Sequence, residues 1–256
     1  MFQKKIIVAN WKMNPLSIED ARASVSATRR FEKKLRKTDI VICPPLIYLE
    51  PISRLIKKSR HISLGAQDVF WNISGAYTGE ISPLMVYNAG GRYAIIGHSE
   101  RRNLGETDEI ISKKVNLALK AGLSVILCVG ERERDGQGLY LGVLRNMLRG
   151  GLVGVSKKSL RNLLVAYEPV FAIGKAEEDA LKPEEVEAMV IFIKKTLADL
   201  YGQDDAKDVR ILYGGSVGPD NAARIVQDGG VHGLLIGRQS LAPEHFKSIL
   251  AEVDRL

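Results

Sequence analysis

One histidine stands where a strand-like run ends. The segment YAIIGHSERR (93–102) passes from apolar residues into Gly97, His98 and Ser99. A short apolar run bounded by glycine is typical of a buried strand, and the C-terminal ends of parallel strands carry the chemistry of α/β sheets and barrels. His98 is therefore a candidate proton donor or acceptor. The alternative is a histidine at the rim that only bonds a loop carbonyl.

Three further polar side chains follow other apolar runs. Asn10 ends the run KIIVAN (5–10) and Lys12 follows it, and Glu168 follows the apolar part of LLVAYEP (163–169). If these runs are parallel strands, their ends share one rim, and we expect the three side chains to converge with His98. A carboxylate, an imidazole and an ammonium group together suit the removal and return of a proton beside a developing negative charge.

The last two apolar runs end in turns that suit an anion. Ser216 follows Gly214 and Gly215, and Gly237 is followed by Arg238. Peptide N–H groups at glycine-rich turns before helices bind anions, and phosphate sites after the seventh and eighth strands recur in α/β barrels. The combination predicts a phosphate-binding region next to the acid–base groups. A Gly-Gly turn by itself is more often just a turn.

The elements that must position these residues alternate along the chain. Helical patterns separate the apolar runs, among them Ser17–Lys37, Thr107–Ala121, Pro183–Tyr201 and Gly218–Asp228. The eight runs are KIIVAN (5–10), DIVICP (39–44), ISLGAQ (62–67), YAIIG (93–97), SVILCVG (124–130), LLVAYEP (163–169), VRILYGG (209–215) and GLLIG (233–237). Strands that are apolar on both faces and separated by helices favour a parallel sheet covered by helices.

We expect an α/β fold in which eight parallel strands close into a (β/α)8 barrel with helices outside. An open doubly wound sheet is the competing fold, but no G-x-G-x-x-G motif follows the first strand. The chain has no low-complexity linker, so residues 1–256 are expected to form a single domain.

Composition excludes several classes of protein. The net charge of +7 would suit a polyanion binder, but the basic clusters RRFEKKLRK (29–37) and KKSR (57–60) lie in helical patterns without interleaved aromatics, which favours solvated helix faces over nucleic-acid binding. No apolar stretch approaches the ~20 residues of a membrane helix, and the N-terminal apolar segment is too short for a secretory signal. Cys43 and Cys128 end apolar runs, as reduced core thiols do. We expect a soluble, cytoplasmic protein.

Six ordered segments resemble the triosephosphate isomerase family over essentially the whole chain. They are ANWKMN (9–14), GAYTGEIS (75–82), IIGHSERR (95–102), CVGE (128–131), AYEPVFAIGK (166–175) and YGGSV (213–217). The resemblance implies the interconversion of dihydroxyacetone phosphate and D-glyceraldehyde 3-phosphate in glycolysis and gluconeogenesis. It also implies no metal or organic cofactor, and a homodimer.

The resemblance assigns roles to the residues at the strand ends. Glu168 would be the base that moves the proton between neighbouring carbons, and His98 would be the electrophile at the substrate oxygens. The family is itself a standard example of a neutral catalytic histidine, and amides around Ser99–Arg101 would disfavour charge on His98. Lys12 would supply positive charge, and Asn10 would donate to a substrate oxygen.

The resemblance also assigns supporting residues. Glu100 would pair with Lys12 or a backbone amide. The segment Pro169–Ala176 resembles the family's lid, whose Gly174 amide would bind the phosphate. Main-chain N–H groups of Ser216, Gly237 and Arg238 would supply the other phosphate contacts. Thr78 would reach into the partner subunit and support Asn10, Lys12 and His98 there.

Five positions depart from the family pattern. Lys175-Ala176 stands where Thr-Gly is usual and Phe171 where Trp is common, which is expected to alter the rate of lid opening. His232 stands where the family often has Asp. Arg238 replaces a second glycine: it would be strained if that glycine needed positive φ, and otherwise its guanidinium could reinforce anion binding.

Two other functions remain as alternatives. One is a different phosphosugar barrel enzyme, which NWKMN, GHSERR and YEPV together disfavour. The other is a catalytically silent phosphate-binding barrel that serves as a scaffold, since a fold does not guarantee activity.

Overall fold

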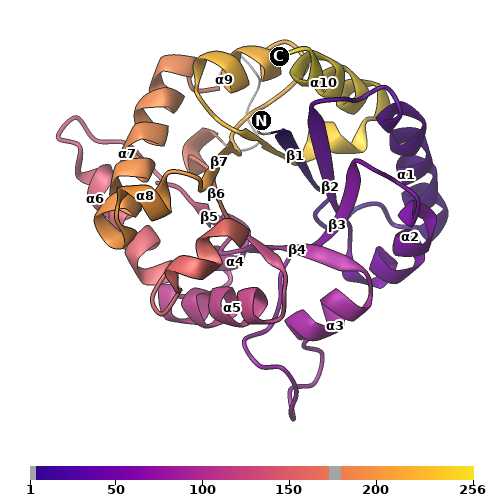
Figure 1. Cartoon of the computed structure of the whole chain (residues 1–256), viewed down its shortest axis with the longest axis horizontal. Coiled ribbons are helices and arrows are strands. Elements are labelled where there is room, and N and C mark those ends of the chain that lie inside the picture. Colours follow the sequence, from indigo (N-terminus) through magenta and orange to yellow (C-terminus); the bar gives the residue numbers. More distant parts are fainter. Residues whose placement is uncertain (1–3, 173–179) are drawn as a thin grey trace.

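Eight parallel strands close into a barrel in the computed structural model, which describes residues 4–172 and 180–256. The strands pair in chain order, and the last pairs with the first (Figure 1). They are β1 (Lys5–Asn10), β2 (Thr38–Cys43), β3 (Ile62–Ala66), β4 (Gly91–Ile96), β5 (Ser124–Val129), β6 (Leu163–Tyr167), β7 (Arg210–Tyr213) and β8 (Gly233–Ile236). The predicted (β/α)8 barrel is confirmed.

Helices surround the barrel as an outer ring (Figure 1). The α-helices are α1 (Ile18–Glu32), α2 (Leu49–Ile56), α3 (Pro83–Asn88), α4 (Ser99–Asn103), α5 (Asp108–Lys120), α6 (Leu139–Gly151), α7 (Pro183–Tyr201), α8 (Gln203–Ala206), α9 (Ala222–Asp228) and α10 (Pro243–Arg255). Short 3-10 turns include η1 (Leu46–Tyr48), η2 (Lys157–Asn162), η3 (Val170–Ala172) and η5 (Arg238–Leu241). Among the described helices none is long and apolar enough to cross a membrane.

Helix boundaries follow the local capping chemistry. Ser17 caps α1, since its side chain accepts a hydrogen bond from the amide of Asp20, and α7 has the predicted bounds. Two helices are shorter than predicted. Helix α1 ends at Glu32 rather than Lys37, because the chain must turn before Thr38 pairs with Lys5. Helix α9 starts at Ala222, because the Asn221 side chain accepts from the Gly218 amide in the turn before it.

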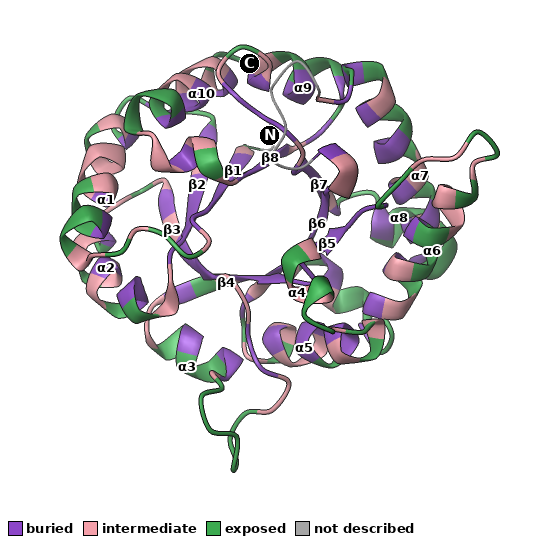
Figure 2. Cartoon of the chain, turned by 180° about the vertical axis from the view of Figure 1, so that it is seen from behind, coloured by how far each residue is buried: buried purple, intermediate pink, exposed green. Residues whose placement is uncertain are grey.

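The strands bury both of their faces (Figure 2). Ile7 and Ala9 of β1 belong to the large apolar cluster that also contains the buried faces of the helices. Ile6 and Val8 belong to a second cluster formed by strand residues alone. This alternation places one set of side chains against the helices and the other inside the barrel. The barrel is therefore a packed scaffold that holds the residues at its rim.

Cys43 and Cys128 are buried and free, as predicted. Both lie in the cluster inside the barrel. Burial raises the pKa of each thiol, so neither is a ready nucleophile at neutral pH.

Candidate active site

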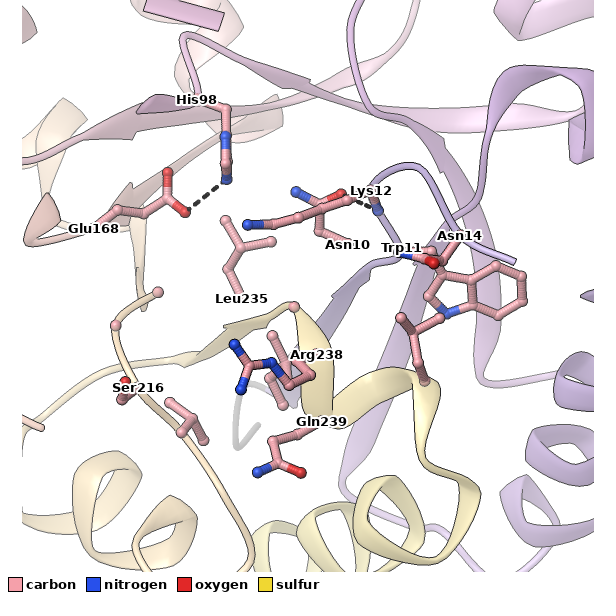
Figure 3. A pocket seen from close by; sticks show the side chains of 16 residues that line it. Asn10, Trp11, Lys12, Asn14, His98, Glu168, Ser216, Leu235, Arg238 and Gln239 are labelled. Carbon is pink, nitrogen blue, oxygen red and sulfur yellow. Dashed lines mark hydrogen bonds and ion pairs between the residues drawn. The ribbon is translucent and has the colours of Figure 1, made fainter. Parts of the chain in front are cut away.

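The carboxyl ends of the strands surround a cavity of about 540 Å³. Residues from β1, β4, β6, β7 and β8, or from the turns that follow them, line it (Figure 3). Seven of the predicted site residues are among them: Asn10, Lys12, His98, Glu168, Ser216, Gly237 and Arg238. The structure thus brings together side chains that are up to 228 positions apart in the sequence.

His98 and Glu168 face each other across the cavity (Figure 3). Nε2 of His98 lies 3.3 Å from Oε1 of Glu168, and both side chains are almost fully buried. Nδ1 of the same imidazole accepts a hydrogen bond of 3.2 Å from the Glu100 amide. Because Nδ1 accepts, the proton of the neutral ring lies on Nε2 and points at the carboxylate.

The charge state of His98 is set by opposing effects. Burial disfavours the imidazolium, but the adjacent Glu168 carboxylate, helped by Glu100, outweighs burial and raises the pKa of His98. The Glu100 amide acts the other way, because protonation of Nδ1 would break its hydrogen bond. The amide contact predicted at the start of α4 is therefore present. The pKa of His98, however, is raised, whereas the sequence led us to expect that positive charge on the ring would be disfavoured. A substrate that enters between the two side chains would remove the main cause of that rise.

Glu168 is a buried carboxylate surrounded by positive and polar groups. Burial raises its pKa, but His98, then the thiol of Cys128 and then Lys12 outweigh burial, and the pKa of Glu168 is lowered. Its backbone amide donates to the Val129 carbonyl at 2.8 Å, which fixes the residue to the end of β5. The group is thus held as an ionised base away from bulk water.

A glycine makes room for this carboxylate. A Cβ atom on Gly214 would lie 2.7 Å from Cγ of Glu168. The turn after β7 can therefore approach the base only because residue 214 has no side chain.

Lys12 has an unusual backbone conformation. Its φ of 52° is the one positive value of a non-glycine residue within the described ranges. Its amide donates to Oδ1 of Asn10 at 3.1 Å, and its carbonyl accepts from Nε2 of Gln67 at 2.7 Å. Such strain persists where surrounding contacts fix the chain, often at functional sites. The ammonium group points into the cavity (Figure 3) and pairs with Glu100 at 2.6 Å.

The turns after β7 and β8 face the same cavity. The hydroxyl of Ser216 donates to the Ala172 carbonyl at 2.8 Å, which connects the turn after β7 to the segment after β6. Gly237 lies against the Lys12 side chain, since a Cβ at 237 would be 3.5 Å from Cε of Lys12. Arg238 has no positive φ. The replacement of glycine at 238 therefore introduces a side chain without left-handed backbone strain.

Other predicted residues lie elsewhere. Thr78 is exposed in the loop between β3 and α3 and does not line the cavity of its own chain. Gly174, Lys175 and Ala176, to which the lid predictions refer, lie outside the described residues.

Sequence reasoning missed a buried network behind the site. Glu131, which follows β5, accepts from the Tyr167 hydroxyl at 2.8 Å and from Nε of Arg134 at 2.8 Å. Arg134 also bonds the Tyr167 hydroxyl at 2.9 Å and lies over the Phe171 ring. Glu131 stands just past a strand end, which is the signal that identified His98. The network fixes the end of β6 directly before the base.

The arrangement suits a barrel enzyme that moves a proton within a small anionic substrate. A carboxylate base and an imidazole donor face one another, an ammonium group lies beside them, and glycine turns border the same cavity. No three His, Cys, Asp or Glu side chains gather as a metal site in the described parts of the chain.

Comparisons with known proteins give the family. The triosephosphate isomerase family model matches residues 5–253. The triosephosphate isomerase of Dictyoglomus thermophilum is 40% identical over 250 residues, which cover 97% of this chain and 99% of that protein. Those of Thermoanaerobacter pseudethanolicus and Geotalea uraniireducens are 40% and 38% identical over 251 residues, 97% of this chain and 99% and 98% of theirs. The chain belongs to the triosephosphate isomerase family.

Proposed function

We propose that this chain interconverts dihydroxyacetone phosphate and D-glyceraldehyde 3-phosphate, a step of glycolysis and gluconeogenesis. The observation that carries the proposal is the buried pair of Glu168 and His98, which face each other in the cavity beside Lys12 and the anion-binding turns.

Glu168 performs the proton transfers on carbon. Its carboxylate removes a proton from C1 of dihydroxyacetone phosphate, and the electron pair of the C–H bond moves to form an enediolate. The protonated Glu168 then returns a proton to C2, which gives the aldehyde. One base can serve both carbons because they are adjacent, and burial keeps its carboxylate from being solvated by bulk water.

His98 serves the two substrate oxygens. Its Nε2–H, which points at Glu168, donates to the carbonyl oxygen as negative charge develops. The proton then passes between the two oxygens as the double bond moves. Lys12 stabilises the enediolate through its positive charge. Asn10 donates from its side-chain nitrogen, which faces the cavity (Figure 3).

The phosphate group lies at the turns after β7 and β8. Main-chain N–H groups of Ser216, Gly237 and Arg238 contact it, and Gly174 is proposed to contribute another amide. Amides held by a rigid barrel need no reorganisation when the anion binds. Holding the substrate by its phosphate also orients the reacting carbons against Glu168.

The active protein is proposed to be a homodimer in the cytoplasm. Thr78 lies at an exposed loop that leaves the barrel between β3 and α3 (Figure 1), where it is available to a second subunit. In the partner it would support Asn10, Lys12 and His98. Free, buried thiols fit a reducing compartment.

Substitution of the two acid–base groups tests the activity. In a coupled assay with either triose phosphate, Glu168→Gln and His98→Gln are each expected to lower kcat by ~10²-fold or more, because each removes a proton-transfer group. Glu187→Gln, an exposed carboxylate on α7, is the matched control and should match the wild-type rate. Wild-type protein that binds phosphate without turnover would instead support a silent scaffold.

A further inference from the structure

One cation of the cavity has no role in the proton-transfer steps. The Arg238 side chain is exposed and lines the cavity at the start of η5, directly after Gly237. Figure 3 shows its guanidinium projecting into the cavity on the side where Ser216 and Gln239 lie, away from the His98–Glu168 pair. The side chain thus lies where the anionic end of the proposed substrate would bind, and not beside the groups that would act on its reacting carbons.

The charged groups around the cavity are paired, apart from this one. Lys12 pairs with Glu100, and Glu168 lies against His98. Within residues 4–172 and 180–256, by contrast, the Arg238 guanidinium makes no ion pair and no hydrogen bond. A planar group with five N–H donors thus faces the cavity with no acceptor among the described residues.

Arg238 and Lys12 border the same turn from two directions. Gly237 precedes Arg238 in the chain, and its backbone lies against Cε of Lys12. An anion held by the Gly237 amide would therefore have an ammonium group on one side and a guanidinium group within reach on the other. Guanidinium binds phosphate oxygens through two parallel hydrogen bonds, which a lysine cannot do.

We propose that the Arg238 side chain is a specificity-determining contact that binds the substrate phosphate and favours its dianion over its monoanion. The inference rests on the proposed function, because it assigns the phosphate of a triose phosphate to this end of the cavity. It differs from the main-chain contact of residue 238, which any amino acid except proline could make.

Binding of the phosphate should depend on pH through this contact. A phosphate monoester loses its second proton near pH 6. Two cations at the anion site stabilise the second negative charge, so binding should weaken as the pH falls through about 6. With Arg238 removed, the site distinguishes the two charge states less well, and binding should vary less with pH.

Three variants of the full chain test this contact: Arg238→Gln, Arg238→Lys and the control Arg149→Gln. Arg149 is an exposed arginine at the end of α6, so its removal lowers the net charge equally. Arg238→Gln is expected to raise KM for dihydroxyacetone phosphate, and the Kd of inorganic phosphate measured by calorimetry, about tenfold. Arg238→Lys should recover part of the loss, and Arg149→Gln should show none.

A substrate without phosphate separates phosphate binding from a general structural effect. D-Glyceraldehyde has the same three carbons, so Arg238→Gln should affect its slow isomerisation far less than that of the phosphorylated substrate. Sulfate remains a dianion over this pH range. The ratio of phosphate to sulfate affinity should therefore change with pH in the wild type and change less in Arg238→Gln.

Two outcomes would overturn the inference: KM and the phosphate Kd within twofold of wild type in Arg238→Gln, or equal losses for both substrates. The calorimetric Kd needs no turnover. Lack of wild-type activity would therefore contradict the proposed function without deciding the role of Arg238.

Discussion

At the scale of single residues, His232 shows how a buried base depends on its hydrogen bond. Its Nδ1 accepts from the Ile211 amide at 3.2 Å, just before β8 starts. Burial lowers its pKa to about 4, and the nearby charges of Lys194 on α7, Lys5 on β1 and Arg210 on β7 act in the same direction. The folded barrel therefore holds this imidazole neutral.

Protonation of His232 is expected to destabilise the barrel in acid. The folded-state pKa lies below the value of about 6.5 in an unfolded chain, so the contribution to stability is present above pH 6.5 and lost as the pH falls towards 4. Allowing for partial solvent exposure, the loss should be about 2 kcal/mol. His232→Asn keeps an acceptor for the Ile211 amide but does not titrate. Urea unfolding of both proteins between about pH 7.5 and 4 measures the difference.

The control for this experiment is His245→Asn, since His245 is exposed on α10. It should lose stability in acid as the wild type does. If His232→Asn also follows the wild-type curve, His232 does not cause the acid sensitivity.

At the scale of elements, one side chain connects three strand ends. Gln67 follows β3 directly, and its Nε2 donates to the carbonyls of Lys12 after β1 and Cys43 at the end of β2. These bonds hold Lys12 in its positive-φ conformation. The position of the ammonium group thus depends on a residue that contributes no charge.

Removal of the Gln67 amide should impair catalysis more than folding. Gln67→Met retains the length of the side chain but removes the side-chain donor to the Lys12 carbonyl, so the Lys12 backbone can relax. The Cys43 carbonyl loses one of its two donors and keeps the Trp11 amide. We expect kcat to fall about tenfold, because small displacements of positioning groups are costly, with a loss of stability of about 1–3 kcal/mol.

Gln227→Met, at an exposed position on α9, is the matched control. Kinetics and thermal unfolding of both variants measure the two effects. An unchanged kcat in Gln67→Met would show that Lys12 holds its position without this bond.

The sequence predicted the elements and their ends better than the contacts between them. Short apolar runs that alternate with helical patterns located all eight strands, and the rule that function follows strand ends identified His98 and Glu168. The same rule applies to Gln67 and Glu131, but it gave no partner for either side chain, so their roles went unnoticed. The bonds from Gln67 to Lys12 and from Tyr167 to Glu131 join different strand ends and form only when the barrel closes.

At the scale of the whole molecule, the positive charge lies away from the active site. Residues 29–37 and 57–61 carry nine Lys and Arg and one Glu, a net charge of +8, whereas the whole chain has +7. These segments precede β2 and β3, at the end of the barrel opposite the cavity. We therefore expect attraction of the substrate to rely on local groups such as Lys12 and Arg238 rather than on the overall charge.

Several exposed apolar side chains, unlike the basic clusters, are found in segments that follow strands. Leu16 and Ile47 are 89% and 76% exposed, and both lie in segments after the first two strands. Ile73 and Tyr77 are also exposed, in the loop after β3 that carries Thr78. Large apolar side chains after three consecutive strands mark a surface suited to protein contact, and this surface adjoins the rim of the cavity.

Charged substitutions on this surface should dissociate the proposed homodimer. Leu16→Asp with Ile47→Asp is expected to shift the mass in light scattering from about twice the chain mass of 28.2 kDa to that mass. Both side chains are too exposed for the change to disturb the folded chain itself. Separation would also remove the partner's Thr78 loop, so kcat should fall about tenfold or more.

Val153→Asp with Ile191→Asp, at sites 63% and 61% exposed, is the control. A wild-type protein with the mass of one chain at micromolar concentration would contradict the dimer, and a monomeric variant with full kcat would show that each barrel completes its site alone.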